Sequence, residues 1–262
     1  MNATDSSSQA HPQFSSHPDL HKGPGRIRVL ISGGTTGIGR ACVLRLARAG
    51  AHVFTFGRHE KELQEVLQAV KRAGGRADGI TADASKPADI ERVFKQADRA
   101  LGGLDAYIAN AALSAEGLTD MAEQDWRYVL ETNLAGYLAS TKEAVKRMQP
   151  NKQGHIVLIG SMSASVRESG SSVYVATKAA IQGFAEALRK EVNETGIHVS
   201  LIEPGAVNTD MQPDPPEEKA RKVREHEMLE ADDIASSVLH ILSQPNRCSI
   251  VRMEIRPRRQ LI

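Results

Sequence analysis

The stretch IRVLISGGTTGIGR (27–40) decides the fold, because it joins a strand pattern to a helix pattern through a glycine-rich turn. Residues 27–32 form a β-branched, apolar run that predicts a buried strand. Residues 37–49 then repeat apolar side chains at helical spacing, which predicts an amphipathic helix. A strand, a glycine turn and a helix in this order are typical of folds in which parallel strands alternate with helices.

The same alternation continues along the chain. After the first strand, near-continuous apolar runs predict further strands at 52–57, 77–83, 104–110, 155–161, 198–204 and 249–255. Helical patterns lie between them at 60–73, 87–101, 121–149, 172–194 and 231–243. Strands that lack polar alternation are covered on both faces. The order therefore predicts an α/β fold with a single Rossmann-fold domain over 26–262, a doubly wound seven-stranded parallel sheet with helices on both faces.

Length and composition exclude several classes of protein. The 262 residues include 33 basic and 32 acidic side chains, so no basic excess favours binding to a nucleic-acid backbone. One Trp, four Tyr and five Phe are too few for a stacking surface. No apolar run approaches the roughly 18 residues that a membrane span needs. Cys42 and Cys248 are too few for a zinc cluster or a disulfide framework, which indicates a reducing, cytoplasmic location.

The first 25 residues differ from the rest in composition. They are rich in Ser, His and Pro and contain no apolar core of a secretory signal, so we expect a disordered tail over 1–25. His11, His17 and His21 are candidate metal ligands in this tail. A flexible tail has no preorganised site, so we expect solvated histidines and no bound metal.

One long irregular segment, 206–229, follows the strand predicted at 198–204. Its prolines interrupt any sheet, while its highly charged second half has a helical pattern. Ligands of open α/β sheets bind at the carboxyl ends of the strands, so this segment is a candidate lid over the site. The alternative is a solvated insertion with no function.

The glycine turn is a candidate anion site. Its spacing is Gly33-x-x-x-Gly37-x-Gly39, which permits a tight turn and brings a diphosphate close to the free N–H groups of the next helix. The alternative is an ordinary strand–helix connection. The second strand ends at Arg58 with no carboxylate nearby, and a guanidinium would bind a ribose 2′-phosphate, which favours NADP(H) over NAD(H). Otherwise Arg58 is a solvated residue.

Tyr174 and Lys178 lie four residues apart at the start of a predicted helix, so they share one face. A phenol is a poor acid or base at neutral pH, and a nearby ammonium would lower its pKa toward the working range. This pair would serve the interconversion of an alcohol and a carbonyl. The spacing alone is common, and the alternative is an exposed pair on a helix.

Together these motifs resemble the short-chain dehydrogenase/reductase family over about residues 26–257. The resemblance consists of the glycine turn, Ser161 after the fifth strand, and Tyr174-x-x-x-Lys178 beginning thirteen residues later. Other matching pieces are Asp83 in TADAS, the sequence Ala109-Asn110-Ala111-Ala112 where the family has Asn-Asn-Ala-Gly, Asn133 in ETNLAG, and Pro204-Gly205 with Thr209.

The resemblance implies a role for each matching residue. Tyr174 would exchange the proton, Lys178 would lower the Tyr174 pKa and hold the nicotinamide ribose, and Ser161 would orient the substrate oxygen. Asn133 would position a water that links Lys178 to solvent. The cofactor-binding residues would be Gly33, Thr35, Thr36, Gly37, Ile38, Arg58, Asp83, Ala84, Asn110, Ala111, Tyr174, Lys178, Pro204, Gly205, Val207 and Thr209.

The sequence departs from the family pattern at three places. Ser32 replaces a Thr but keeps a hydroxyl, so we expect little change. Ala109 and Ala112 replace an Asn and a Gly, which removes hydrogen bonds near the cofactor and adds a methyl group. The segments GHIVLIGSMSAS (154–165) and VYVATKAA (173–180) are most similar to the NADP-dependent 3-hydroxy acid and serine dehydrogenase subgroup.

Ser163 and Arg167 lie between Ser161 and Tyr174, in the part of the chain that lines the substrate pocket in this family. Arg167 would hold a substrate carboxylate, or else it is a solvated loop residue. The resemblance also implies a homotetramer or homodimer, formed through the long helices at 121–149 and 172–194.

We therefore expect an NADP(H)-dependent oxidoreductase that transfers a hydride between the cofactor and a small, polar carbonyl or alcohol, with Tyr174 as general acid and base. The alternative is a non-catalytic sensor or scaffold that binds the dinucleotide. The changes at Ala109 and Ala112 are its only support, since the set Asn133, Ser161, Tyr174 and Lys178 is complete.

Overall fold

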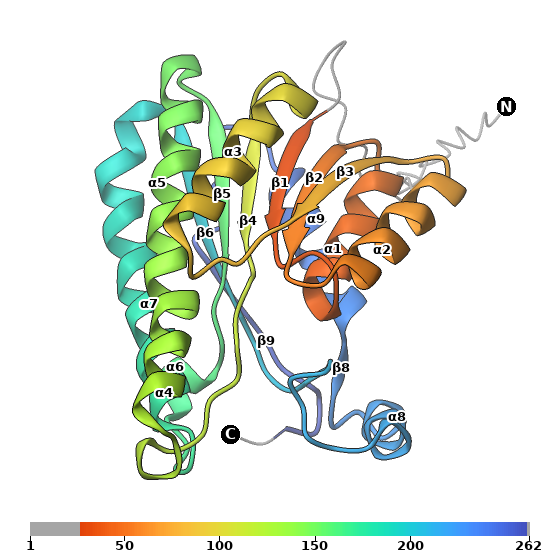
Figure 1. Ribbon diagram of the computed structural model, residues 1–262, viewed down its shortest axis with the longest axis vertical. Helices are drawn as coiled ribbons and strands as arrows, with labels where there is room; N and C mark the ends of the chain where they lie inside the picture. Colours follow the sequence, from red (N-terminus) through yellow and green to blue (C-terminus); the bar gives the residue numbers. More distant parts are fainter. Residues whose placement is uncertain (1–26, 261–262) are drawn as a thin grey trace, which may run out of the picture.

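Seven strands form one parallel sheet in the computed structural model of the protein, which describes residues 27–260 (Figure 1). The order across the sheet is β3-β2-β1-β4-β5-β6-β9. The strands are β1 (Arg28–Ser32), β2 (His52–Gly57), β3 (Arg76–Thr81), β4 (Ala106–Ala109), β5 (Gly154–Ile159), β6 (Ile197–Pro204) and β9 (Arg252–Ile255). The doubly wound seven-stranded sheet is therefore confirmed. Its order reverses between β1 and β4, which is where such sheets bind ligands.

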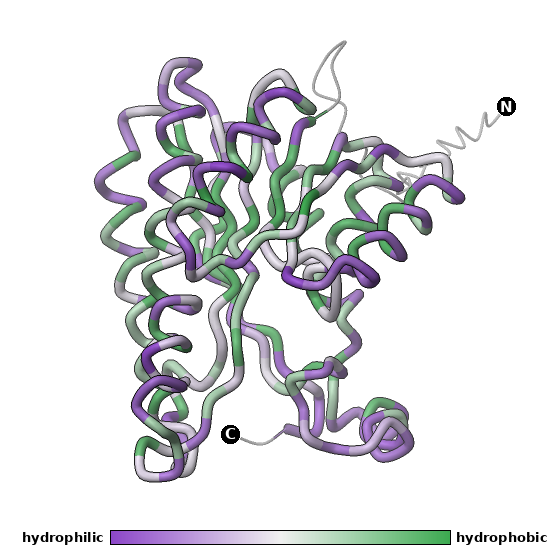
Figure 2. The backbone as a smooth tube through the Cα atoms, in the orientation of Figure 1, coloured by the Kyte–Doolittle hydropathy of each residue, from purple (hydrophilic) through white to green (hydrophobic). Residues whose placement is uncertain are grey.

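Helices cover both faces of the sheet because the strands are apolar on both sides. One face packs against α1 (Gly37–Arg48), α2 (Glu60–Arg72) and α9 (Ala231–Leu242). The other face packs against α3 (Pro87–Leu101), α5 (Gly136–Met148) and α7 (Ser172–Val192). Figure 2 shows apolar residues along the strands and polar residues on the outer sides of the helices. Two hydrophobic cores, one on each face, therefore hold the sheet rigid.

The helix predicted over 121–149 is interrupted in the structure. It consists of α4 (Glu123–Leu130), a π-helical turn over Glu131–Ala135, and α5. A π turn inserts one residue into the helical ladder, and such turns are frequent at functional sites. Apolar periodicity did not reveal it, because the turn is flanked by regular helix on both sides. Short 3₁₀ turns occur at Leu118–Asp120, Gln149–Asn151 and Asn193–Thr195.

Two predicted strands end two residues earlier than expected, close to two of the site residues. The strand predicted to reach residue 83 ends at Thr81, so Asp83 lies in the loop after β3. The strand predicted over 155–161 ends at Ile159, so Ser161 follows β5, as the family motif implies, and lies just before the short helix α6 (Ser163–Val166). Both side chains are thereby placed at the carboxyl edge of the sheet.

The segment 206–229 lies at this same edge (Figure 1). It contains β7 (Val207–Asn208) and α8 (Pro216–Arg224), and β8 (Leu229–Glu230) follows and pairs with β7 in a two-stranded parallel sheet. The helical second half is confirmed, while closure of this segment as a lid stays a prediction. The predicted tail over 1–25 lies outside the described residues. Within 27–260, no helix is long and apolar enough to cross a membrane.

Candidate functional site

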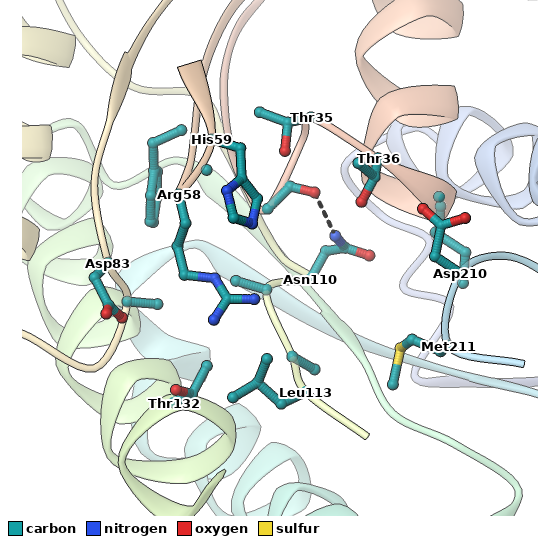
Figure 3. A pocket seen from close by; sticks show the side chains of 18 of the residues that line it. Thr35, Thr36, Arg58, His59, Asp83, Asn110, Leu113, Thr132, Asp210 and Met211 are labelled. Atoms are coloured by element: carbon teal, nitrogen blue, oxygen red, sulfur yellow. Dashed lines mark hydrogen bonds between the residues drawn. The ribbon is translucent and has the colours of Figure 1, made fainter. Parts of the chain in front are cut away.

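A pocket opens at the carboxyl ends of β1, β2, β3 and β4 (Figure 3). Its walls come from the glycine turn, the end of β2, the loop after β3, the segment 110–113 and the start of the 206–229 segment. The lining residues are Gly33, Thr35, Thr36, Gly37, Ile38, Phe56, Gly57, Arg58, His59, Ala82, Asp83, Ala84, Asn110, Ala111, Ala112, Leu113, Thr132, Thr209, Asp210 and Met211. All the cofactor residues expected from β1 to Ala111 are therefore brought together.

The glycine turn packs so closely against the segment after β4 that a side chain at Gly33 would not fit. Gly33 has a φ of +66°, and a Cβ there would lie 2.8 Å from the Cα of Ala111. The first helix starts at Gly37, and its N-cap Thr36 makes no capping hydrogen bond with its side chain. The N-terminus of α1, with its free backbone N–H groups and its positive dipole end, is thus part of the pocket wall. A phosphate group would bind well at this part of the wall.

Ser32 and Asn110 fasten the segment after β4 to the glycine turn. The buried Ser32 Oγ accepts hydrogen bonds from the backbone N–H of Asn110 (2.9 Å) and of Ala111 (3.1 Å). Asn110 Nδ2 in turn donates to the carbonyl oxygens of Ser32 (3.1 Å) and Gly33 (3.0 Å, dashed in Figure 3). The pocket wall is braced in this way although residue 109 is an alanine.

The Arg58 guanidinium points into the pocket beside Asp83 (Figure 3). Arg58 Nη1 donates to the Tyr128 hydroxyl (3.1 Å), which donates to Asp83 Oδ2 (2.9 Å). Burial alone would raise the pKa of Asp83, but hydrogen bonds from Ser85 and Tyr128 hold that pKa below its ordinary value. Among the described residues that line this pocket, Arg58 has the one permanent positive charge. An anionic group of a ligand would therefore bind here.

Thr132 lines the first pocket and belongs to no motif that was predicted from the sequence. It lies in the π turn, next to Asn133, and its Oγ1 is buried without a hydrogen-bond partner within residues 27–260. A buried hydroxyl without a partner costs free energy, so its position suits a ligand that supplies the missing bond. Only the neighbouring Asn133 drew attention in the sequence.

A second pocket continues from the first one and shares Ile38, Asn110, Ala112, Thr209 and Met211 with it. Three of the expected catalytic residues line it, namely Ser161, Tyr174 and Lys178. Other expected residues in its wall are Ser163, Pro204, Gly205 and Val207. Several more residues of this wall carry no motif in the sequence, among them Ser171, Gln212 and Gln260. Gln260 comes from the far end of the chain, so no local pattern pointed to it.

Lys178 is buried beneath Tyr174. Its Nζ donates to the Ile159 carbonyl oxygen (3.0 Å) and lies 5.5 Å from the ring centroids of both Tyr174 and Tyr137. Burial lowers the pKa of Lys178 to about 8. The Ile159 carbonyl therefore fixes the ammonium at the base of the pocket, on the ring side of Tyr174.

The pKa of Tyr174 is raised rather than lowered, which is opposite to the expected effect of Lys178. Burial of the phenol raises it, a hydrogen bond with Ser161 lowers it, and the negative charge of Glu168 raises it again. The Lys178 Nζ lies 5.5 Å from the centre of the Tyr174 ring, and burial outweighs any lowering of the Tyr174 pKa by this ammonium. Tyr174 is thus protonated at neutral pH in this structure.

Asn133 connects the π turn to the pocket wall. Its Oδ1 accepts from the Leu113 backbone N–H (2.7 Å), and its Nδ2 donates to the Leu113 carbonyl oxygen (2.8 Å). The buried amide therefore satisfies both polar groups of a loop residue that lines the first pocket. The contact with Lys178 through a water stays a prediction.

Arg167 does not appear among the residues that line either pocket. Its backbone has a φ of +58°, its Nε donates to the Ala164 carbonyl oxygen (3.4 Å), and its side chain is exposed. The next residue, Glu168, lines the second pocket in its place. The left-handed backbone at Arg167 turns the chain, so that the two neighbours point in different directions.

Comparisons with known proteins agree with this geometry. The family described as short chain dehydrogenase matches residues 28–220. An uncharacterized oxidoreductase of Staphylococcus aureus (strain MRSA252) is 30% identical over 87% of this chain and 96% of its own length.

Two solved structures are similar over nearly their whole length. A short chain dehydrogenase from Burkholderia cenocepacia in complex with NADP is 29% identical (TM-score 0.79, 88% of this chain, 96% of that chain). A serine dehydrogenase complexed with NADP+ is 27% identical (TM-score 0.81, 90% of this chain, 97% of that chain).

Proposed function

The chain belongs to the short-chain dehydrogenase family, and from this premise we propose that it is an NADP(H)-dependent oxidoreductase that interconverts a small carbonyl compound and its alcohol. The observation that carries this proposal is the position of Ser161, Tyr174 and Lys178 in one pocket that continues into a phosphate-suited pocket. The substrate oxygen would lie against Ser161 and Tyr174 in that second pocket.

The residues of the first pocket fit a dinucleotide. The glycine turn and the N-terminus of α1 would bind the diphosphate, and the Arg58 guanidinium would bind the ribose 2′-phosphate through charge-assisted hydrogen bonds. On the same wall, Thr132 offers a buried hydroxyl that has no hydrogen-bond partner in the described part of the chain. The cofactor, when bound, supplies the hydride. Lys178 would hold the nicotinamide ribose, and Pro204, Gly205, Val207 and Thr209 would line the nicotinamide end.

Tyr174 is the group that would move a proton. Its raised pKa keeps the phenol protonated at neutral pH, which is the form that donates a proton to a carbonyl oxygen. Ser161 would hold the same oxygen by a hydrogen bond. In the reverse direction, oxidation of an alcohol, the phenolate form of Tyr174 would accept the proton instead.

The test is a panel of aldehydes and ketones with NADPH and NADH side by side, followed by absorbance. In Tyr174→Phe, we expect turnover to fall by roughly 10²–10⁴, the usual contribution of general acid catalysis, while the NADPH Kd measured by fluorescence changes little. Full turnover by this variant would refute the role of Tyr174. Binding of NADPH without turnover of any compound in the parent protein would indicate a sensor or scaffold instead.

A further inference from the structure

Glu168 sets the charge of the second pocket. Among the described residues that line it, Glu168 and Lys178 are the two whose side chains are ordinarily charged at neutral pH. Lys178 is buried at the base of the pocket and bound to the Ile159 carbonyl oxygen. The charge that remains for a substrate to meet is therefore the Glu168 carboxylate.

The Glu168 carboxylate has no hydrogen-bond or ion-pair partner among the residues that the structure describes. Its Oε2 is buried and has no hydrogen-bond partner within residues 27–260, and no ion pair to Glu168 is formed there. The neighbouring Arg167 is directed to the Ala164 carbonyl oxygen instead. A buried carboxylate oxygen without a donor costs free energy, and a ligand that supplies the donor recovers it. The terminal torsion of a glutamate is broad, so a small rotation turns either oxygen toward the pocket.

We propose that Glu168 selects a substrate with an ammonium group close to its carbonyl or alcohol carbon, that is, an amino ketone or an amino alcohol. An ammonium group would pair with the carboxylate through a charge-assisted hydrogen bond. A substrate carboxylate would meet the like charge of Glu168 and would find Lys178 already bound at the base of the pocket. The proposal rests on the proposed oxidoreductase function and narrows its substrate class.

A second effect would act on the proton donor. The negative charge of Glu168 raises the pKa of Tyr174. A positive substrate beside Glu168 would offset that charge, so that Tyr174 would release its proton more readily when the correct substrate is bound. The same contact would thus serve both selection and turnover.

The test uses the full-length protein and a set of small methyl ketones that differ in charge. At a pH below the pKa of its amine, aminoacetone is cationic. Hydroxyacetone is neutral and carries a hydrogen-bond donor, whereas butan-2-one is neutral and carries none. Pyruvate is anionic. We expect kcat/KM with saturating NADPH to be at least about tenfold higher for aminoacetone than for butan-2-one, the lower end for a hydrogen bond to a charged group. Glu168→Gln keeps the size of the side chain and brings this ratio close to one.

The matched control is Glu116→Gln, which makes the same chemical change at an exposed residue outside the pocket wall. It is expected to keep the parent ratio. Each of four results would overturn the proposal. The first two are a ratio near one in the parent protein and a ratio that Glu168→Gln leaves unchanged. The other two are a kcat/KM for hydroxyacetone equal to that for aminoacetone and a preference for pyruvate.

A binding measurement separates this proposal from the proposed function. Calorimetry in the presence of NADP+ compares 1-aminopropan-2-ol with butan-2-ol, and the amino alcohol is expected to bind at least about tenfold more tightly in the parent but not in Glu168→Gln. Turnover of butan-2-one without any preference for amines would overturn the role of Glu168 alone. Amine binding that depends on Glu168, without turnover of any ketone, would overturn the oxidoreductase function and support the binding site.

Discussion

Replacement of Ser32 by alanine tests how the pocket wall is held together. Ser32 is 2% exposed. Its Oγ accepts hydrogen bonds from the backbone N–H groups of Asn110 and Ala111. The same hydroxyl donates to the Ile108 carbonyl oxygen at 3.4 Å. Ser32→Ala removes the shared acceptor and leaves both N–H groups beside the pocket without one.

The loss of stability in Ser32→Ala follows from the burial of the two N–H groups. An unsatisfied buried N–H costs about 1–3 kcal/mol, and the two N–H groups are only partly buried, so that water replaces some of the lost bonding. We expect Ser32→Ala to lower the free energy of unfolding by about 2 kcal/mol, which for a domain of this size lowers Tm by roughly 4–8 °C. The NADPH Kd is expected to rise as well, since Asn110 and Ala111 line the cofactor pocket.

Thermal and urea denaturation, with an NADPH titration by fluorescence, check this expectation. Ser32→Thr keeps the hydroxyl and is expected to bind NADPH as the parent does. Ser236→Ala, at an exposed position of α9, is the matched control and is expected to change stability by no more than about 0.5 kcal/mol. If Ser32→Ala unfolds at the same temperature as the parent and binds NADPH equally well, the hydroxyl does not brace the wall.

Two further predictions concern the charged groups of the site. Arg58→Asp is expected to weaken NADPH binding by roughly tenfold to a hundredfold, while NADH binding changes little. Equal affinities of the parent protein for NADPH and NADH would contradict the role of Arg58. Burial lowers the pKa of Lys178 to about 8 in the folded chain, against an ordinary value of 10.5. Between these pH values the unfolded chain therefore binds more protons at Lys178 than the folded chain does. The contribution of Lys178 to the free energy of unfolding accordingly rises with pH between pH 8 and pH 10.5. Relative to the parent, Lys178→Met is expected to be more stable by up to roughly 3 kcal/mol below pH 8, and this difference is expected to disappear toward pH 10.5. Urea denaturation at several pH values measures the difference. A difference that does not depend on pH would refute the buried ammonium.

The sequence predicted the fold well because its signals are local. Seven apolar runs and the helical patterns between them fix a parallel sheet, since unbroken apolar strands need cover on both faces. The prediction failed at element ends and at the π turn over 131–135, because hydrogen bonding within a helix does not follow from the period of its apolar residues. The ends of β3 and β5 moved by about two residues, and this places Asp83 and Ser161 in loops.

The candidate site was predicted by motif, and most of its residues line the two pockets. The electrostatics of the site did not follow from spacing. Four residues between Tyr174 and Lys178 place both on one helix face, but only the structure shows that the ammonium faces the ring and bonds Ile159. The pKa of Tyr174 is raised by burial, an effect that depends on distant segments and that the spacing does not contain.

The amino-acid sequence by itself determined the layers of the fold, the anion-suited glycine turn and the set of groups that would do chemistry. The first two follow from local patterns, and the third follows from short motifs that resemble those of a known family. The tertiary structure alone decided which side chains share a pocket and how each is charged. Arg167 and Glu168 are adjacent in sequence, yet only Glu168 lines the pocket, since the left-handed backbone at Arg167 turns the chain there. Burial and charge depend on neighbours from distant segments, and a sequence read locally does not contain those neighbours.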